Sequence, residues 1–150
     1  MNRSTLVPRA GVAAGMAAAI VVAGIGVAAA SSSDTSATSH TMRFVGSQLK
    51  DVQAGYSDVA TDNNTWKGKT TGYDVTSCVI DIQSHVANCK VAVARANGIL
   101  YGHAKVNVDT GEGSGKVTGG SGGFHGATGT MTISPGSDQN SNKITITYQV

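Results

Sequence analysis

The run GEGSGKVTGGSGGFHGATGTMTI, from Gly111 to Ile133, holds nine glycines in its first nineteen residues. That much glycine disfavours a helix, because glycine loses more backbone freedom on folding than any other residue. The end of the run alternates polar and apolar residues with the period of two that is typical of a β-strand. We therefore expect a tight reversal over Gly119 to Gly126, in which several residues need positive φ, and a strand from about Ala127. Phe124 would fold back over this turn and close one end of a β core.

Two other interpretations of the glycines compete with this one. A flexible linker fits the composition, although the central aromatic residue and the strand directly after it argue against a linker. A phosphate-binding loop does not fit. Thr110 stands where a P-loop requires its first glycine, and Val117 follows Gly115-Lys116 in place of serine or threonine. No helix-forming segment comes next to supply a dipole, so nucleotide binding is not expected.

The first thirty residues have the features of a secretory signal peptide. Residues 1–9 carry two arginines and no acid, residues 10–30 form an uncharged apolar run, and the run ends in three alanines before Ser31. We expect export with cleavage near Ala30. Since the run is about long enough to span a bilayer, a retained N-terminal membrane anchor is the alternative. Residues 31–40 are polar and are expected to form a flexible tether.

After such cleavage the chain would be a single domain of about 120 residues. Eleven basic residues less Arg3 and Arg9 leave nine, which balance nine acidic residues. The net charge of +2 therefore belongs to the signal peptide. We expect no nucleic-acid partner and no stable membrane association after cleavage.

Patterns of short strands dominate from Thr41 onward, and no amphipathic helix of useful length appears. Asn97-Gly98 is a strong hairpin signal, and residues 62–64 indicate a turn. Seven or eight short strands with turns every eight to twelve residues predict a barrel or a sandwich. The segments with a strand pattern are residues 42–45, 49–52, 66–70 (edge-like), 73–82, 91–94, 99–108, 128–133 and 144–150.

The two cysteines, Cys78 and Cys89, are eleven residues apart. In an exported chain this pair most simply forms one structural disulfide. Two cysteines lack the partners and spacing of a zinc site, and a redox pair is more usually C-x-x-C, so neither a metal nor a redox role is expected. If Cys78 faces Cys89 across a hairpin, Asp74 faces Val93. If Asn97-Gly98 is the next turn, Cys89 faces Val106.

This pairing separates two faces of the sheet. The more apolar face, which we expect to point inward, has Asp74 and Arg95 as its only charges. Their register puts them close enough to pair, either as a buried structural ion pair or as a functional pair at the mouth of a cavity. The inward face carries Asp74, Cys78, Ile80, Cys89, Val91, Val93, Arg95, Leu100, Gly102, Ala104 and Val106, and the outward face Tyr73, Val75, Val79, Lys90, Ala92, Tyr101, His103 and Lys105.

The segment GGSGGFHGATG, residues 119–129, resembles the signature of dirigent proteins and allene oxide cyclase-like barrels, roughly G-G-T-G-x-[FY]-x-x-A-[RT]-G followed by a strand. Bacterial secreted members also look similar through residues 72–102, and the likeness covers about residues 41–150. It implies an eight-stranded antiparallel calycin-like barrel with a central cavity, often trimeric. Plant members cyclise an unstable fatty-acid epoxide or steer the coupling of phenoxy radicals. The signature residues here are Gly119, Gly120, Gly122, Phe124, Gly126 and Gly129.

Two positions depart from that signature. Gly123 stands where dirigent proteins often carry aspartate, and Thr128 stands where they carry arginine, so no catalytic residue is carried over. His125 is the only histidine near the signature. No set of nucleophile, base and orienting residue can be assembled. The residues that we consider candidates for lining a ligand cavity are Asp74, Arg95, Tyr73, Phe124 and His125.

The sequence thus predicts a secreted, disulfide-bonded, all-β, eight-stranded antiparallel barrel over residues 41–150. Its expected role is to hold or orient a small apolar molecule, with no cofactor and no metal. One alternative is a cofactor-free cyclase or isomerase of the allene oxide cyclase type. Another is an extracellular structural or interaction protein with no ligand. A filled, dry core would favour this last alternative, and an open cavity with convergent polar groups would favour the other two.

Overall fold

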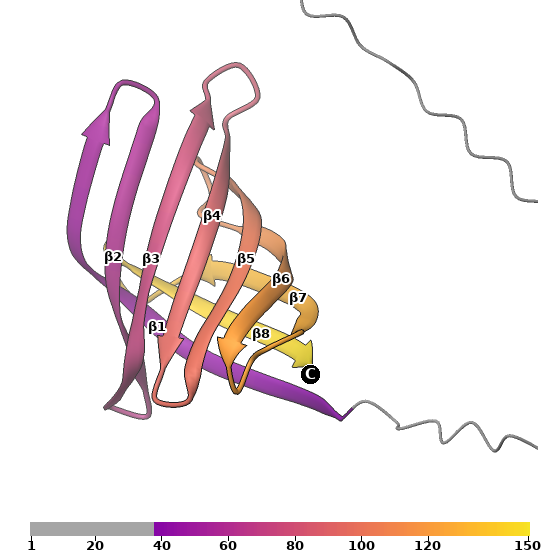
Figure 1. Cartoon of the computed structure of the whole chain (residues 1–150). Coiled ribbons are helices and arrows are strands. Elements are labelled where there is room, and N and C mark those ends of the chain that lie inside the picture. The colour runs from indigo at the N-terminus through magenta and orange to yellow at the C-terminus, as the bar shows by residue number, and fades with distance from the viewer. Residues whose placement is uncertain (1–37) are drawn as a thin grey trace, which may run out of the picture. The chain divides into compact units, whose positions relative to one another are not determined.

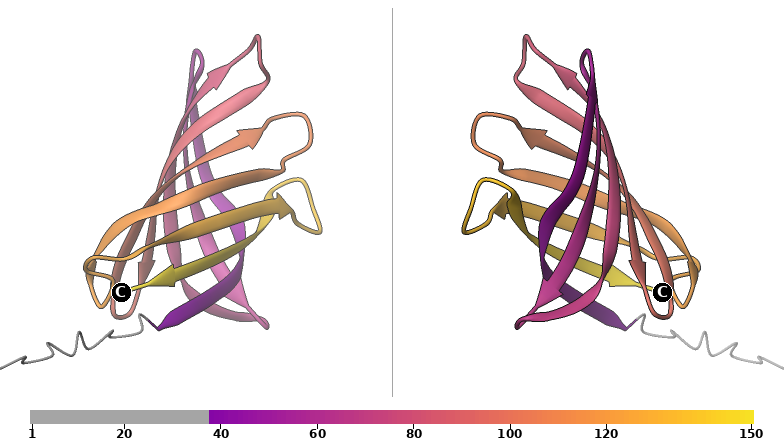
Figure 2. Two further views of the ribbon diagram at one scale, coloured as in Figure 1. Left: turned by 90° about the vertical axis from the view of Figure 1, so that its right-hand side faces the viewer. Right: turned by 90° about the vertical axis from the view of Figure 1, so that its left-hand side faces the viewer.

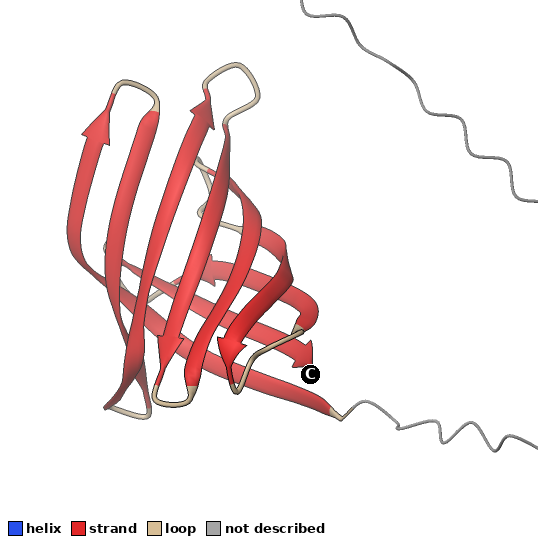
Figure 3. Ribbon diagram, in the orientation of Figure 1, coloured by secondary structure: helices blue, strands red, loops and turns tan. Residues whose placement is uncertain are grey.

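The computed structural model describes residues 38–150, which form eight antiparallel strands and no helix (Figures 1 and 3). Each strand pairs with the next, and β8 pairs with β1, so the sheet closes into a barrel. The predicted eight-stranded antiparallel barrel is confirmed. The strands are β1 (Ser39–Ala54), β2 (Ser57–Trp66), β3 (Lys69–Asp81), β4 (Val86–Arg95), β5 (Gly98–Asn107), β6 (Gly113–Gly122), β7 (Thr128–Pro135) and β8 (Ser141–Gln149).

The predicted signal peptide, residues 1–30, and most of the predicted tether lie outside the described residues. The last two tether positions are not a tether: Ser39 and His40 begin β1 and pair with Gln149 and Tyr148 of β8. The His40 ring also stacks on Tyr148, with centroids 5.4 Å apart. Within residues 38–150 there is no helix that could cross a membrane.

The two ends of the barrel differ in the hairpins that they carry, and at one end the strands extend to different lengths. The end with the β1–β2, β3–β4, β5–β6 and β7–β8 connections is called the open end here, and the opposite end the closed end. Strand β1 pairs with β8 only as far as Ser47 but continues beside β2 to Ala54. Figure 2 shows that β1 to β4 therefore extend farther than β7 and β8 at the open end.

Strand β1 is longer than the sequence pattern predicted, and β2 was not predicted as a strand. The two short strands expected at residues 42–45 and 49–52 are one strand with a register shift between Gln48 and Lys50. The turn predicted at residues 62–64 is wrong, because these residues pair with β1 on one side and β3 on the other. The edge-like segment at residues 66–70 contains the β2–β3 turn, where Lys67 and Gly68 both have positive φ (51° and 75°), as in a type I′ turn.

The glycine run is ordered, and the linker interpretation is wrong. Most of its glycines belong to β6, so the reversal is limited to residues 123–126 and is shorter than predicted. The strand expected from about Ala127 begins at Thr128. The glycines allow the backbone of the neighbouring strand to approach closely: a Cβ on Gly113 would lie 2.7 Å from the Lys105 carbonyl oxygen. Because glycines have no side chains, this strand shows no alternation of polar and apolar residues, and its sequence therefore suggested a turn.

The β4–β5 hairpin differs from the prediction by two residues. Ala94 faces Ile99, and Cys89 faces Ala104 where Val106 was expected. Gly98 lies in β5 opposite Gly122, where a Cβ would lie 3.1 Å from the carbonyl carbon of Ser121. Close packing of the strands therefore requires this glycine inside the strand. A shift of two residues preserves the parity, so the predicted inward and outward faces remain.

The β3–β4 register agrees with the prediction, since Cys78 faces Cys89 and Asp74 faces Val93. The disulfide Cys78–Cys89 is present. Residues predicted on the inward face, such as Val93 and Leu100, are almost fully buried. Residues predicted on the outward face, such as Tyr73 and Val79, are exposed.

Candidate functional site

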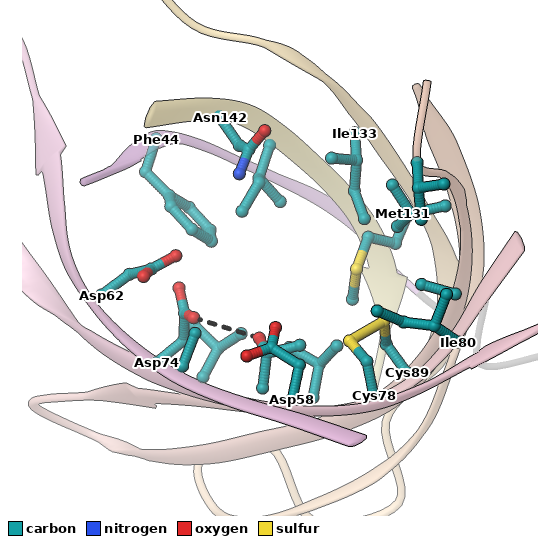
Figure 4. A pocket seen from close by; sticks show the side chains of 18 residues that line it. Phe44, Asp58, Asp62, Asp74, Cys78, Ile80, Cys89, Met131, Ile133 and Asn142 are labelled. Carbon is teal, nitrogen blue, oxygen red and sulfur yellow. Dashed lines mark hydrogen bonds between the residues drawn. A yellow bond between two sulfur atoms is a disulfide. The ribbon is translucent and has the colours of Figure 1, made fainter. Parts of the chain in front are cut away.

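The barrel contains a cavity of about 230 Å³ in the half toward the open end (Figure 4). Val108, at the rim, is exposed, and the β1–β2 hairpin borders the cavity through Asp58. Most of the wall is apolar. The lining residues are Phe44, Asp58, Ala60, Asp62, Asp74, Thr76, Cys78, Ile80, Ala87, Cys89, Val91, Val93, Val106, Val108, Met131, Ile133, Asn142 and Ile144.

Three carboxylates lie on one side of this cavity, as Figure 4 shows. Asp58 and Asp62 are four residues apart on β2, so the period of two puts both on the same face of the strand. Asp74 on β3 is the register partner of Asp62. Two neighbouring strands therefore bring all three side chains to the interior, where apolar residues are usual.

Asp74 is the most deeply buried of the three, at 2% exposed. Thr76 Oγ1 donates a hydrogen bond of 3.4 Å to Asp74 Oδ1, whereas Oδ2 has no hydrogen-bond partner. Burial, together with repulsion from Asp62, raises the pKa of Asp74 to about 6, although Asn64, Thr76 and the Arg95 charge act in the opposite direction. A carboxyl with this pKa can bind or release a proton near neutral pH.

Asp58 and Asp62 are perturbed in the same direction. Desolvation, the neighbouring Asp51 and repulsion from Asp62 raise the pKa of Asp58 to about 6. Burial also raises the pKa of Asp62. One oxygen of each, Asp58 Oδ1 and Asp62 Oδ1, is buried without a hydrogen-bond partner. The cluster therefore presents several unused acceptors in a largely apolar cavity.

Arg95 does not pair directly with Asp74, which corrects the predicted ion pair. Its guanidinium lies 4.4 Å from the centre of the Phe44 ring. Nε donates to the Met42 sulfur at 3.2 Å, and Nη1 donates to the Ala94 carbonyl oxygen at 3.3 Å. The one salt bridge between side chains of residues 38–150 joins His85 and Asp109.

The position of Arg95 explains this. It lies two residues beyond Val93, the register partner of Asp74, and its side chain occupies space that a Cβ on Gly72 would need. From there it reaches Phe44 on β1 and does not line the cavity. Burial lowers the pKa of Arg95, and the Asp74 charge opposes that shift.

Of the other predicted cavity residues, none lines the cavity. Tyr73 is 55% exposed on the outer face. Phe124 is buried at the closed end, with its ring edge-on to Tyr148 at 5.5 Å between centroids. His125 is exposed in the β6–β7 turn. Phe124 thus closes one end of the core as predicted, and Asp74 is the one candidate that lies at the cavity.

The sequence analysis missed Asp58, Asp62 and Phe44. A signal was present in β2, where Asp58, Ala60, Asp62 and Asn64 alternate with Val59, Thr61 and Asn63. This alternation is the reverse of the usual one, because the more polar set, which begins with Asp58, faces the interior. A segment with this reversed alternation is easily mistaken for a loop. Residues 38–150 contain no group of three histidine, cysteine, aspartate or glutamate side chains close enough to hold a metal ion.

Comparison with known proteins adds information about the fold. No protein-family model matches the chain, and no curated protein sequence is significantly similar to it. Among solved structures, one described as pyocyanin demethylase superimposes with a TM-score of 0.64 at 16% identity, covering 73% of this chain and 99% of that chain. At this identity the likeness supports the barrel architecture alone. The resemblance to the dirigent and allene oxide cyclase-like signature stays a prediction.

Proposed function

We propose that this protein is a secreted barrel that binds a small, largely apolar molecule in the cavity. The observation that carries the proposal is the cavity itself, about 230 Å³ with mostly apolar walls and three convergent carboxylates. For scale, a cavity of about 150 Å³ accommodates benzene. An eight-stranded barrel can either fill its interior with side chains or hold one small ligand. The space here suits a molecule of one or two rings.

The unpartnered acceptors also support a ligand. A buried polar atom without a hydrogen bond costs about 1–3 kcal/mol. Asp58, Asp62 and Asp74 each have such an oxygen. Groups that destabilise the folded protein are frequent at functional sites, because a ligand can complete their hydrogen bonding. A merely structural barrel gains nothing from this arrangement, which disfavours the alternative of a scaffold without a ligand.

Export is supported by the disulfide, since disulfides persist in oxidising compartments. The predicted signal peptide, with cleavage near Ala30, is in line with the same conclusion. N-terminal sequencing of protein from the culture medium is expected to begin at or near Ser31. Retention of the full chain in the membrane fraction would contradict export.

A cofactor-free enzyme is the second candidate, and one observation favours it. Asp58 and Asp74 have pKa values raised to about 6, in the range that suits general acid–base catalysis near neutral pH. Such pKa values are compatible with a cyclase or isomerase of the allene oxide cyclase type, which the glycine signature resembles. The solved barrel of similar fold is described as a demethylase of pyocyanin. Turnover of a bound compound would separate catalysis from simple binding.

Native mass spectrometry of the exported protein tests the proposed binding. Ala87→Phe adds a ring to a residue that lines the cavity, and Ala92→Phe adds the same ring to the outer face of the same strand. The parent protein should either carry a co-purifying molecule or show a higher melting temperature with a one- or two-ring fragment. Ala87→Phe should abolish this binding, and Ala92→Phe should preserve it. Equal binding by parent and folded Ala87→Phe protein would contradict a ligand in this cavity.

A further inference from the structure

We propose that the cavity selects an organic cation with N–H donors, such as a protonated amine on a body of one or two rings. This inference rests on the proposed binding function and specifies its ligand class. It follows from the charges around the cavity, the hydrogen-bonding character of the unpartnered atoms and the position of Arg95.

The charges that line the cavity all have the same sign. Among its eighteen lining residues three are aspartates, and none is lysine, arginine or histidine. The remaining lining residues are apolar, apart from Thr76 on β3 and Asn142 on β8. Beside the cavity, Asp51 on β1 adds another negative charge near Asp58. The lining therefore repels anions and attracts cations.

Arg95 is the one cationic side chain near the cluster, and its contacts are with other groups, while Nη2 is buried without a hydrogen-bond partner. Its guanidinium contacts the Phe44 ring, Met42 and the Ala94 carbonyl. It forms no direct salt bridge with Asp74, although its charge still acts on that carboxyl. The three carboxylates are thus incompletely compensated within the described barrel, and a bound cation would supply the missing charge.

The unpartnered atoms of the residues that line the cavity are acceptors, whereas the unpartnered donors Asn64 Nδ2 and Arg95 Nη2 belong to residues that do not line it. Asp58 Oδ1, Asp62 Oδ1 and Asp74 Oδ2 are carboxylate oxygens, and each is buried without a hydrogen bond. Asp74 is more than nine-tenths buried and is drawn with its carboxylate toward the cavity in Figure 4. An ammonium group offers three donors and a positive charge, so it can form charge-assisted hydrogen bonds with such oxygens.

The remainder of the lining suits the body of such a ligand. Phe44 lies beside the carboxylates and contributes apolar surface, since its ring already packs against the Arg95 guanidinium. Ile80, Met131, Ile133 and Ile144 form an apolar wall for a ring system. A metal ion is a poor alternative, because within residues 38–150 no three suitable ligands lie close enough to share one.

The inference predicts a definite pH dependence. Asp58 and Asp74 have pKa values of about 6, so acidification through that value removes negative charge from the cavity. Asp62 and Asp51 face the same cluster, and Arg95 is the nearby cation. Affinity for a cation should therefore fall as the pH decreases below about 6, while affinity for a neutral molecule of the same shape should change little.

Three probes with the same ring system test the charge preference: 1-naphthylmethylammonium, 1-naphthylmethanol and 1-naphthoate. Calorimetry at about pH 7.5 should show the ammonium binding roughly tenfold more tightly than the alcohol, with the carboxylate weakest. At about pH 5 the advantage of the ammonium should largely disappear. Asp74→Asn should weaken ammonium binding and leave alcohol binding unchanged. Glu112→Gln, at an exposed acidic residue that does not line the cavity, is the control and should change neither.

Several results would overturn the inference. Equal affinity for ammonium and alcohol would refute the cation preference and leave the proposed binding function intact. Ammonium binding that responds neither to pH nor to Asp74→Asn would place the charge contact elsewhere. If Asp74→Asn does not fold, the pH series on the parent protein decides the question. If none of the three probes binds but the fragment experiment above finds a neutral ligand, the cation preference is refuted and the proposed binding function stands. If neither experiment finds a ligand, both proposals are refuted.

Discussion

The closed and open ends of this barrel have different interiors. At the closed end Leu100, Phe124, Ala127 and Ile146 are almost completely buried and pack together with Tyr148. At the open end the interior keeps a cavity, and its polar wall includes unpartnered carboxylate oxygens. The same eight strands run through both ends. The difference indicates that the closed end provides stability, whereas the open end gives up part of it, which agrees with the proposed binding.

Hydrogen bonding between hairpins strengthens the closed end further. The Gly123 N–H donates to the Asn97 carbonyl oxygen at 2.7 Å, which joins the β6–β7 and β4–β5 turns. The Phe124 and Ala127 backbone groups then complete the reversal with a bond of 3.0 Å. The resembled glycine signature therefore lies in the stabilising end of the molecule and does not reach the cavity.

The largest expected effect is at the closed end. Phe124→Ala removes a ring that is 2% exposed and that contacts Tyr148. Truncation of a buried phenylalanine typically costs about 3–5 kcal/mol. Thermal and denaturant unfolding should show a loss in this range, and His125→Ala, in the same turn, is the control. A melting temperature within a degree or so of the parent would show that the closed end is not the stable part.

A second substitution tests the same packing through the backbone. A Cβ on Gly120 would lie 2.5 Å from the Phe124 Cβ and 2.8 Å from the Ile99 carbonyl oxygen. Gly120→Val should therefore destabilise the protein by a comparable amount, about 3 kcal/mol, since neither backbone nor ring can move without cost. Gly126→Val would be a poor control because its φ is positive, so Thr118→Val, on the exposed side of β6, is used. Equal stability of Gly120→Val and Thr118→Val would contradict the close packing.

The disulfide lines the cavity and connects β3 to β4. Replacing both Cys78 and Cys89 by alanine should cost about 2–3 kcal/mol, because the closed loop is short. Unfolding of the parent with and without reductant gives an independent value. Mass mapping should find one intramolecular link and no free thiol in the exported protein. Two alkylatable thiols would refute the bond.

At the open end one substitution should increase stability. The pKa of Asp74 is raised from 3.8 to about 6, so the folded protein holds its proton more tightly than the unfolded chain does. This contribution is complete below about pH 4 and is lost as the pH rises to about 6. Asp74→Asn removes the ionisation, so at about pH 7.5 it should stabilise the protein by on the order of 2 kcal/mol. The gain should vanish at about pH 4, and a loss of stability at neutral pH would show that the Asp74 charge is well compensated.

The smallest effect is expected on the outer face. Tyr73 was a candidate cavity residue, but it is 55% exposed and points away from the interior. Tyr73→Ala should change the free energy of unfolding by no more than about 0.5 kcal/mol and should leave ligand binding unchanged. A clear loss of binding would place the functional site outside the barrel.

The sequence predicted the parts of the fold in which apolar and polar residues alternate normally. In β3 and β4 this alternation and the cysteine pair identified the inward face, because only one parity buries both cysteines together with Val91 and Val93. Register errors of two residues, as in the β4–β5 hairpin, left the faces unchanged. The disulfide followed from the same reasoning.

The candidate site was predicted poorly for a physical reason. Burial of apolar area is the basis of the alternation rule, and the cavity depends on breaking that rule at Asp58 and Asp62. Similarly, the glycines of β6 have no side chains to show an alternation, so the strand was mistaken for a turn. Phe44 was not identified because its position at the cavity depends on packing with residues that are distant in the sequence, such as Arg95.

Methyl NMR with the naphthylmethylammonium probe tests the central claim most directly, because it locates binding within the barrel. Ile80, Ile133 and Ile144 line the cavity, whereas Ile146 is fully buried in the packed core and does not. At about pH 7.5 the probe should shift the methyl signals of the three cavity isoleucines and leave those of Ile146 almost unchanged. Shifts confined to exposed methyl groups, or equal shifts at all isoleucines, would contradict a ligand site in the open half of the barrel.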